Sequence, residues 1–162
     1  MLVSIIIAAY NNGKYLKDAL DSCFRQTYQN IEIIYSDDGS TDNSCEIAEK
    51  YNIKMIVSTI NRGVVSARNA GFDNSSGDFL VFLDGDDILK ENYIEETLNI
   101  ACNSGADVVY TDVQTFGDLN VYRIHNTSKK ALWKKNDCHS SSLIKRESFI
   151  KAGKWQETKY NT

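Results

Sequence analysis

Acidic side chains cluster at two places in this sequence, each directly after a short apolar run. One cluster is Asp37 and Asp38, and the other is Asp84, Asp86 and Asp87. Like charges that share a site repel one another and raise one another's pKa, so such clusters are unfavourable unless something offsets their charge. A divalent metal ion that carries a phosphorylated ligand would offset it. The sequence therefore predicts a site for a metal ion and a phosphate-bearing molecule.

The elements that must position these acids alternate along residues 1–110. Apolar runs of strand length alternate with segments of helical periodicity, and short connections join them. This pattern is typical of a parallel sheet covered by helices on both faces. We expect strands over residues 3–9, 31–35, 55–57, 79–83 and 108–110, and helices over residues 15–24, 63–72 and 93–101, with a further helix capped by residues 40–42 and running to residue 51.

The pattern weakens after Asp112. Candidate strands cover residues 119–124 and 141–144, and a short helix covers residues 147–152 before Gly153. We therefore expect a single α/β domain over residues 1–162, with a Rossmann-like, mostly parallel sheet flanked by helices and an irregular C-terminal third.

Ligands of open parallel sheets bind beyond the carboxyl ends of the strands, near the switch in strand order. The first expected strand ends in the small residues Ala8 and Ala9, followed by Tyr10 and Asn11. This arrangement would let a flat ring approach the backbone. Asp38, at the end of the second strand, could accept hydrogen bonds from a base or a ribose.

The fourth expected strand ends in Asp84, Gly85 and Asp86. Two carboxylates that are two residues apart in an extended segment point to the same side, and the glycine between them leaves room for a diphosphate. Such hard oxygen ligands suit Mg²⁺ or Mn²⁺ held jointly by carboxylate and phosphate. The alternative is that the acids serve only as caps or Asx-turns and that Tyr10 is a packing residue. The order and spacing of the whole set favour a binding site.

Bulk composition excludes several classes of protein. The 162 residues carry a net charge of -4, which argues against a nucleic-acid-binding protein. No apolar run approaches the ~18 residues that span a bilayer, and residues 1–7 lack the features of a signal peptide, so we expect a cytosolic protein.

The cysteines form no Cys-x-x-Cys pair and are expected to be free thiols. The alternative is a metal-binding or nucleophile pair at Cys138-His139. The cysteines are Cys23, Cys45, Cys102 and Cys138.

Taken together, these segments resemble the catalytic domain of glycosyltransferase family 2, which has the GT-A fold. The matching stretches occur in the family's order across most of residues 1–100, and several together are highly specific. They are Val3–Asn11, Gln26–Tyr28, Asp37–Asp42, Asn61–Gly71, Ser76–Phe79 and Phe82–Asp87.

By this resemblance, residues 1–112 form a nucleotide-sugar-binding half. Ala8, Tyr10 and Asp38 lie where the family holds the base and the ribose. Arg68 matches a family arginine near the nucleotide, where its guanidinium could bind phosphate or brace an acidic loop. The alternative for Arg68 is an ordinary arginine on a helix surface.

The resemblance also implies a reaction. Asp84 and Asp86 fill the outer positions of the family's D-x-D motif, with Asp86 as the direct ligand of Mn²⁺ or Mg²⁺. The expected chemistry is transfer of a sugar from a nucleoside diphosphate to an acceptor hydroxyl with inversion. The metal stabilises charge on the leaving diphosphate, and a carboxylate deprotonates the hydroxyl. We expect a saccharide or lipid-linked acceptor and a role in surface polysaccharide synthesis.

Residues 113–162 are expected to form an incomplete acceptor-side half. The family takes its catalytic base from an acidic pair shortly after a Gly-x-aromatic-x-Glu stretch, present here as residues 153–157, and no further acid follows in this sequence. We therefore assign no catalytic base within the chain and expect it beyond Thr162. This expectation fits either a piece of a longer enzyme or a module that binds the donor without transferring it. His139 and Ser140 are candidates for the acceptor side or for diphosphate contacts.

Two other features allow competing interpretations. Lys129–Lys135 is cationic with an apolar centre and could rest on the inner face of a membrane. The alternative is a solvated loop with Trp133 turned inward.

The Asp84–Asp87 segment superficially resembles the Asp-x-Asp loop of haloacid-dehalogenase-type phosphatases. In that fold the loop follows the first strand, whereas here it follows the fourth, which argues against a phosphatase.

Overall fold

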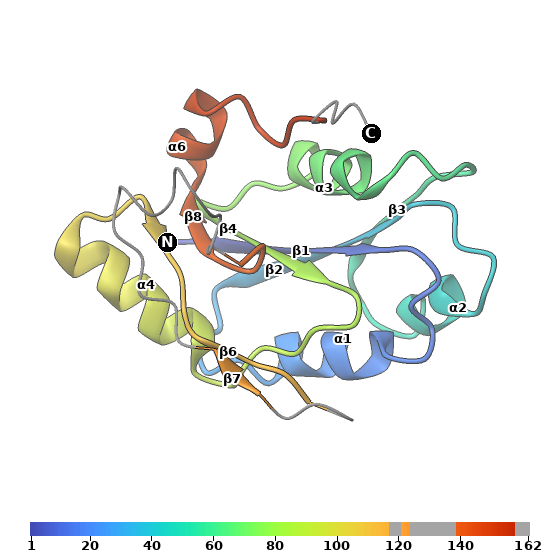
Figure 1. Ribbon diagram of the computed structural model, residues 1–162, viewed down its shortest axis with the longest axis horizontal. Coiled ribbons are helices and arrows are strands. Elements are labelled where there is room, and N and C mark those ends of the chain that lie inside the picture. Colours follow the sequence, from blue (N-terminus) through green and yellow to red (C-terminus); the bar gives the residue numbers. More distant parts are fainter. Residues whose placement is uncertain (117–120, 124–138, 158–162) are drawn as a thin grey trace.

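The computed structural model describes residues 1–116, 121–123 and 139–157. Within this part of the chain, helices cover both faces of a six-stranded sheet (Figure 1). The strands of the sheet are β1 (Val3–Ala9), β2 (Ile31–Asp37), β3 (Lys54–Val57), β4 (Phe79–Asp84), β5 (Val108–Val109) and β8 (Leu143–Lys145). The helices are α1 (Leu16–Phe24), α2 (Ser44–Ala48), α3 (Val64–Asp73), α4 (Tyr93–Ser104) and α6 (Arg146–Lys151). The predicted α/β class is confirmed.

The sheet has the order β3-β2-β1-β4-β8-β5, and β1 to β4 are mutually parallel. The register aligns Ala8 of β1 with Asp84 of β4, and Ala9 with Asp37 of β2. Both acid-bearing strands therefore end at the same edge of the sheet. The chain crosses from β2 and β3 on one side of β1 to β4 on the other, so this edge lies at a switch in strand order, where ligands of open α/β sheets bind.

Side chains of β1 alternate between two apolar cores. Ile5 and Ile7 pack toward α1 and α4 on one face, whereas Ile6 packs with Phe72 of α3 and Phe149 of α6 on the other. Figure 1 shows α3 and α6 on one side of the sheet and α1, α2 and α4 on the opposite side. Because β1 is buried on both faces, its residues are apolar except for Ser4, whose buried hydroxyl donates to Glu32.

Helix α2 is shorter than predicted, since it ends at Ala48 and the sequence indicated a helix to Tyr51. Lys50 and Tyr51 donate hydrogen bonds to carbonyls three residues back, at 3.2 and 3.0 Å. The last turn is therefore tightened into a 3₁₀-type turn and does not continue the α-helix. Capping residues and apolar spacing do not distinguish these two forms.

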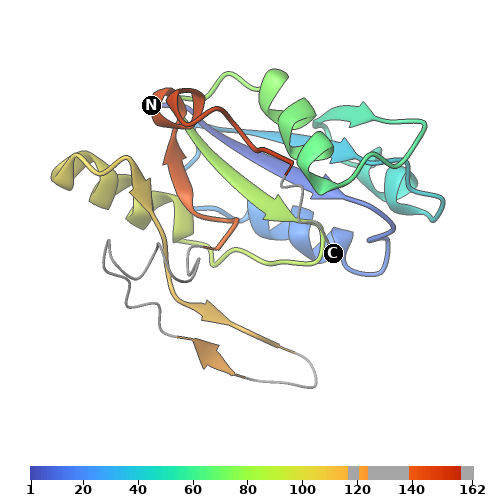
Figure 2. The same ribbon diagram turned by 45° about the horizontal axis from the view of Figure 1, so that its top comes forward.

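The region after Asp112 contains a pair of strands that the sequence only partly indicated. Strand β6 (Val113–Gln114) pairs antiparallel with β7 (Tyr122–Arg123), and Figure 2 shows this pair extending away from the sheet. Strand β6 was missed because two residues are too few to show a periodic pattern. The expected strand over residues 119–124 is described only at residues 121–123. Strand β8 runs antiparallel to β4 and β5, close to its expected position.

Glu32 joins the start of β2 to the loop that precedes β4. One carboxylate oxygen accepts hydrogen bonds from the Ser4 hydroxyl at 2.6 Å and from the backbone amides of Ser76 and Gly77 at 2.5 and 2.9 Å. Burial disfavours the charged form of Glu32, but these donors more than offset it, so the pKa of Glu32 lies below its usual value. A carboxyl group whose pKa falls on folding stabilises the protein above its unfolded pKa, and this stability is lost as the pH falls through the folded pKa.

We expect Glu32→Gln to lower the free energy of unfolding at neutral pH by about 1–2 kcal/mol, because the neutral amide is a weaker acceptor for these donors. The loss should shrink as the pH falls below about 4.3, where the unfolded-state carboxyl becomes protonated. Urea denaturation at several pH values measures both effects. Glu49→Gln, at an exposed position, is the matched control and should change stability by less than about 0.5 kcal/mol. Equal effects of the two substitutions would contradict the prediction.

Candidate functional site

A cavity of about 430 Å³ opens at the carboxyl ends of β1 and β4. Its lining comes from the end of β1, the loop after β2, the start of α3 and the turn after β4. Eight residues predicted from the sequence line it: Ala8, Ala9, Tyr10, Asp38, Arg68, Asp84, Gly85 and Asp86. Asn11 is not part of this lining, because its side-chain oxygen accepts a hydrogen bond from the Thr41 amide at 2.8 Å and holds the loop after β2. Asn12 and Asn61, which the sequence analysis missed, also line the cavity.

The two acids after β2 make different contacts. Asp37 accepts hydrogen bonds from the Tyr35 hydroxyl at 2.8 Å and the Ser40 amide at 2.7 Å. Asp37 is therefore a turn-forming residue, as the Asx-turn alternative predicted. Asp38 is 4% exposed, and its two oxygens accept from the backbone amides of Arg62 at 2.9 Å and Gly63 at 2.7 Å. It thereby fixes the start of α3, and a nucleoside would have to use the lone pairs that these bonds leave open.

Arg68 reaches from α3 to the end of β4. Its Nη2 lies 2.6 Å from Asp84 Oδ1, and its side chain is 12% exposed, so it is not a solvent-facing arginine. The guanidinium group lies 4.8 Å from the ring centre of Trp155. Its Nε is buried and has no hydrogen-bond partner among the described residues. Arg68 therefore braces the acidic loop and retains one buried donor.

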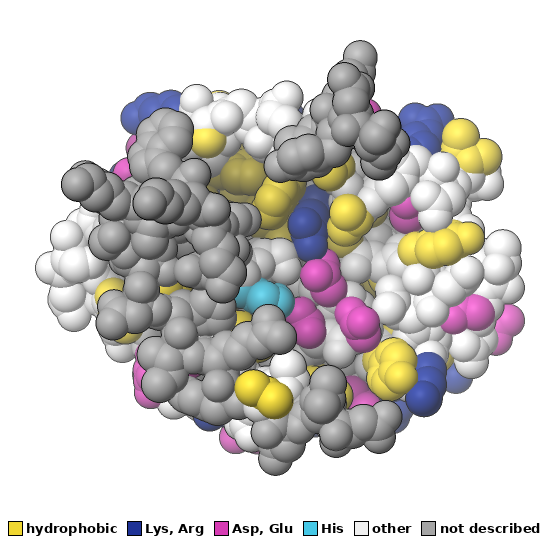
Figure 3. All heavy atoms as spheres, in the orientation of Figure 1, with side chains coloured by type: hydrophobic (Ala, Val, Ile, Leu, Met, Phe, Trp, Pro, Cys, Tyr) yellow, Lys and Arg dark blue, Asp and Glu magenta, His cyan; other side chains and the backbone are white. Residues whose placement is uncertain are grey.

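His139 and Ser140, the candidates for the acceptor side or for diphosphate contacts, lie beside the acidic turn. Ser140 Oγ donates to Asp84 Oδ2 at 3.3 Å, and His139 Nε2 lies 3.8 Å from Asp87 Oδ2. Burial raises the pKa of Asp87, and the neighbouring carboxylates of Asp84 and Asp86 raise it further against the opposing effect of His139. Figure 3 shows acidic side chains gathered at the centre of this face, with a basic side chain and a histidine next to them.

The acids could hold a metal ion only together with another ligand. Among the described residues, no group of three His, Cys, Asp or Glu side chains is arranged to bind one. Asp84 already contacts Arg68 and Ser140, whereas Asp86 is exposed and lines the cavity. Carboxylate oxygens suit Mg²⁺ and Mn²⁺, and such ions usually complete their coordination with water and substrate phosphates. The residues present therefore fit a metal ion that binds together with a diphosphate.

A segment near the described C-terminal end is clamped onto α3. The Asn69 side chain donates to the Trp155 carbonyl at 3.0 Å and accepts from the Trp155 amide at 3.3 Å. Trp155 also meets Phe82 of β4 edge-on, with ring centres 5.5 Å apart. The sequence analysis missed this clamp, although Trp155 is the aromatic residue of the quoted Gly-x-aromatic-x-Glu stretch. This segment and Arg68, which lines the cavity, are thus in direct contact.

Sequence comparison assigns the chain to a family. The model of the family described as Glycosyl transferase family 2 matches residues 4–153. The chain belongs to glycosyl transferase family 2. Membership in this family rules out the phosphatase interpretation of the Asp84–Asp87 segment, and it accounts for the ordered series of motifs from β1 to β4.

Two relatives of this chain are proteins named as glycosyltransferases. GlyG of Streptococcus pneumoniae is 40% identical over 128 residues, which cover 75% of this chain and 42% of that protein. An uncharacterized glycosyltransferase of Haemophilus influenzae is 38% identical over 136 residues, which cover 80% of this chain and 54% of that protein. The chain spans about half the length of these curated relatives.

Solved structures confirm the GT-A fold of this family 2 domain. TarS 1-349 of S. aureus in complex with UDP aligns with a TM-score of 0.79 at 21% identity, covering 94% of this chain and 49% of that one. A mannosyltransferase of Pyrobaculum calidifontis in complex with GDP-Man and Mn²⁺ aligns with a TM-score of 0.74 at 18% identity, covering 94% and 46%. At these identities the likeness establishes the fold alone.

Several predictions fall on other parts of the chain. Cys23, Cys45 and Cys102 are free thiols, as predicted. Cys138 and the cationic stretch Lys129–Lys135 lie outside the described residues. None of the helices in the described ranges has the length and apolar character that crossing a bilayer requires.

The expected position of the catalytic base also falls outside the part of the chain that the structure describes. The described residues end at Glu157, whereas the base is expected beyond Thr162, which is itself outside them. The position of the base therefore stays a prediction, and none of the described acids is assigned to this role.

Proposed function

We propose that this domain transfers a sugar from a nucleoside-diphosphate sugar to an acceptor hydroxyl, with inversion and with the help of a divalent metal ion. The observation that carries the proposal is the cavity at the ends of β1 and β4. It combines small residues, a braced arginine and three carboxylates in a member of glycosyl transferase family 2. The fold neighbours support it, because they were solved with UDP, UDP-GlcNAc and GDP-Man.

In this proposal residues 1–112 form the donor half and residues 113–162 contribute to the acceptor side. Ala8 and Ala9 leave the backbone open to a flat base, and Tyr10, which is 45% exposed, stands beside them. Asp38 accepts a hydrogen bond from the nucleoside with its remaining lone pairs. Asn11 does not line the cavity but supports the site by holding the loop after β2 through its hydrogen bond with the Thr41 amide.

The diphosphate would lie between α3 and the turn after β4. Arg68 offers its buried Nε and its charge to phosphate oxygens, and Gly85 leaves space beside the acids. Asp86, together with Asp84, would hold Mn²⁺ or Mg²⁺, and such an ion supplies charge stabilisation to the departing diphosphate. Ser140 orients Asp84 by its hydrogen bond to Oδ2.

The second candidate function is donor binding without transfer. An attacking hydroxyl must lose its proton to a base, and we assign this role to none of the acids in the described ranges.

The proposed role in surface polysaccharide synthesis belongs to the first candidate, sugar transfer. We place the reaction in the cytosol. For a lipid-linked acceptor, we place it at the inner face of the membrane. Loss of a surface polysaccharide from cells that lack this protein tests that role.

A thermal-shift panel of UDP, GDP, CDP and dTDP, each with and without Mn²⁺, tests donor binding. A ligand of the native state at about 100 times its Kd stabilises the fold by about 2.7 kcal/mol. We expect one nucleotide to raise the midpoint, and more so with Mn²⁺. The absence of a shift with every nucleotide would contradict both candidate functions. A shift without sugar transfer to any offered acceptor would favour the donor-binding module.

A further inference from the structure

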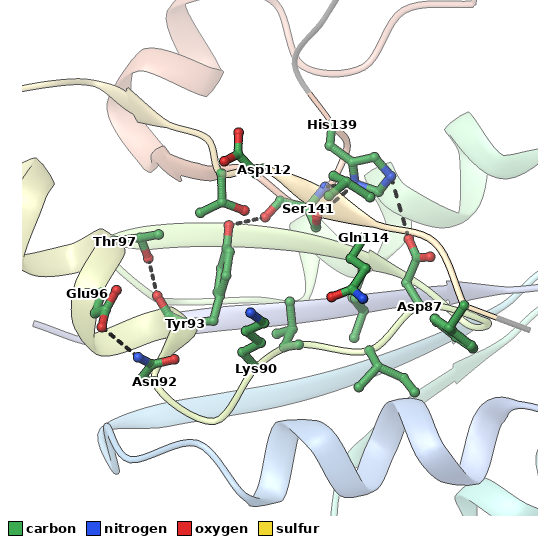
Figure 4. A pocket seen from close by; sticks show the side chains of 16 residues that line it. Asp87, Lys90, Asn92, Tyr93, Glu96, Thr97, Asp112, Gln114, His139 and Ser141 are labelled. Carbon is green, nitrogen blue, oxygen red and sulfur yellow. Dashed lines mark hydrogen bonds and ion pairs between the residues drawn. The ribbon is translucent and has the colours of Figure 1, made fainter. Parts of the chain in front are cut away.

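Asn69 of α3 follows Arg68 in the sequence but lies outside the cavities around the acidic turn. It does not line the cavity at the ends of β1 and β4. It also does not line a second cavity of about 590 Å³, which Figure 4 shows between Tyr93 from the start of α4 and His139 from the segment before β8. Asn69 would therefore act on a molecule bound in either cavity through other residues.

The side-chain amide of Asn69 holds one residue at two points. Its Nδ2 donates to the Trp155 carbonyl at 3.0 Å, and its Oδ1 accepts from the Trp155 amide at 3.3 Å. Two bonds to one residue fix its orientation as well as its position. Asparagine supplies a donor and an acceptor on one planar group, which neither alanine nor ionised aspartate does. The chain after α6 is thereby attached to α3, beside which it runs in Figure 1.

The ring of Trp155 depends on this backbone attachment. Its Nε1 is buried and has no hydrogen-bond partner among the described residues. The ring instead packs edge-on against Phe82 and Phe149, with ring centres 5.5 and 6.3 Å away. Apolar packing is not directional, so the two bonds from Asn69 supply the directional restraint on Trp155.

Trp155 in turn contacts the guanidinium of Arg68. The guanidinium lies 4.8 Å from the centre of the Trp155 ring, and its Nη2 lies 2.6 Å from Asp84 Oδ1. A cation within about 6 Å of the centre of an indole ring is attracted to its face. A chain of contacts therefore runs from Asn69 through Trp155 and Arg68 to Asp84 at the end of β4.

We propose that Asn69 is a positioning residue for the nucleoside-diphosphate sugar. By holding Trp155 against the guanidinium of Arg68, it keeps that group oriented toward the diphosphate. The proposal rests on the function proposed above and adds a residue that touches neither the donor nor the metal ion. Loss of the Asn69 bonds would leave Arg68 on α3 with more conformational freedom, and freedom that must be given up on binding lowers affinity.

The fluorescence of Trp155 tests the first step without any ligand. The sequence holds two tryptophans, so Trp133→Phe leaves Trp155 as the single emitter, and indole emission shifts to longer wavelength when water reaches the ring. In this background we expect Asn69→Ala to cause such a shift, with circular dichroism confirming that the variant is folded. Asn69→Asp keeps the acceptor and removes the donor, so it should shift the emission in the same direction in a variant closer in shape.

The matched control is Asn74→Ala. It removes an exposed amide at the C-terminal end of the same helix, where the side chain donates to the Ala70 carbonyl at 3.0 Å. Asn74 lines neither cavity. The emission of Trp155 should be unchanged in this variant.

A double-mutant cycle on nucleotide affinity tests the second step. UDP, GDP, CDP and dTDP are titrated with Mn²⁺ into the full chain. For a nucleotide that binds, we expect Asn69→Ala to raise the Kd about three- to tenfold, which corresponds to the loss of one cation–π contact. In a Trp155→Leu background, which lacks the ring, the same substitution should change the Kd less than about twofold, because residues that act through one another are not additive. Asn74→Ala should leave the Kd unchanged.

The outcomes distinguish this proposal from the proposed function. An unchanged emission in both Asn69 variants, an unchanged Kd, or an equal effect of Asn69→Ala with and without the Trp155 ring would overturn the positioning role. Failure of the unsubstituted chain to bind any of the four nucleotides would contradict the proposed function and, with it, the role of Asn69 toward the donor, even where the emission shows that Asn69 holds Trp155.

Discussion

Asp86→Asn is expected to abolish most of the Mn²⁺ dependence of nucleotide binding. Asp86 is the exposed acid of the turn after β4 and lines the cavity of about 430 Å³ at the ends of β1 and β4. An amide keeps the size of the side chain but removes the negative charge that a hard cation requires. Loss of residues that merely support metal ligands already costs about 10–100-fold in affinity, so we expect at least a comparable loss here. Titration of Mn²⁺ at saturating nucleotide, followed by thermal shift, measures it.

The matched control for this prediction is Asp18→Asn, an exposed acid on α1 away from the cavity. It should leave the Mn²⁺ titration unchanged. Asp84→Asn is a less suitable variant, because Asp84 also pairs with the largely buried Arg68 and removal of one partner of a buried pair destabilises the fold itself. An Asp86→Asn protein that retains the Mn²⁺ dependence of the unsubstituted chain would show that Asp86 is not the metal ligand.

Phe82→Ala should cause a large loss of stability, about 3–5 kcal/mol in the free energy of unfolding. Phe82 is fully buried in β4, and its ring centre lies 5.1 Å from that of Phe149 and 5.5 Å from that of Trp155. Its removal leaves a cavity beneath the segment that clamps onto α3. Because Trp155 stacks on Arg68, we also expect weaker nucleotide binding. Urea denaturation and the nucleotide panel measure the two effects.

Phe24→Ala serves as the control for ring size, since Phe24 is 50% exposed and contacts only the ring of Tyr51 among the described aromatic pairs. Its cost should stay below about 1 kcal/mol. If Phe82→Ala cost no more than Phe24→Ala, the aromatic cluster of β4, α6 and Trp155 would not be a stabilising core. If Phe82→Ala lowered the free energy of unfolding but left nucleotide affinity unchanged, Phe82 would stabilise the core without positioning Arg68.

The sheet, and the meeting of the residues at its strand ends in one cavity, were predictable because their signals are local. A strand buried on both faces is a nearly continuous apolar run, as in Val3–Ala9 with its single polar residue Ser4, and its end is marked by a change to small or acidic residues. The register that aligns Ala8 with Asp84 then follows from parallel pairing. Asp37 and Asp38 show the limit of this approach. They are adjacent acids in the sequence, yet one forms a turn and the other fixes the start of α3.

Contacts between distant segments could not be predicted in the same way. The Asn69–Trp155 clamp and the second cavity depend on how α3, α4 and the segment before β8 approach one another in space. Side-chain amides and isolated aromatic residues leave no periodic signal in a sequence. Strand β6 was missed for a related reason, because its pairing with β7 is set by tertiary geometry over only two residues.

The position of β8 has a consequence for how the protein is made. Strand β4 pairs with β1 on one edge, but its other neighbour, β8, is translated only after α4, β5 and the β6–β7 pair. A nascent chain therefore exposes one edge of β4, with unpaired amides and carbonyls, until Leu143–Lys145 leaves the ribosome. Exposed strand edges are templates for aggregation. The strand that carries Asp84 thus gains its second neighbour, and β5 its one neighbour in the described sheet, only when translation has continued to β8.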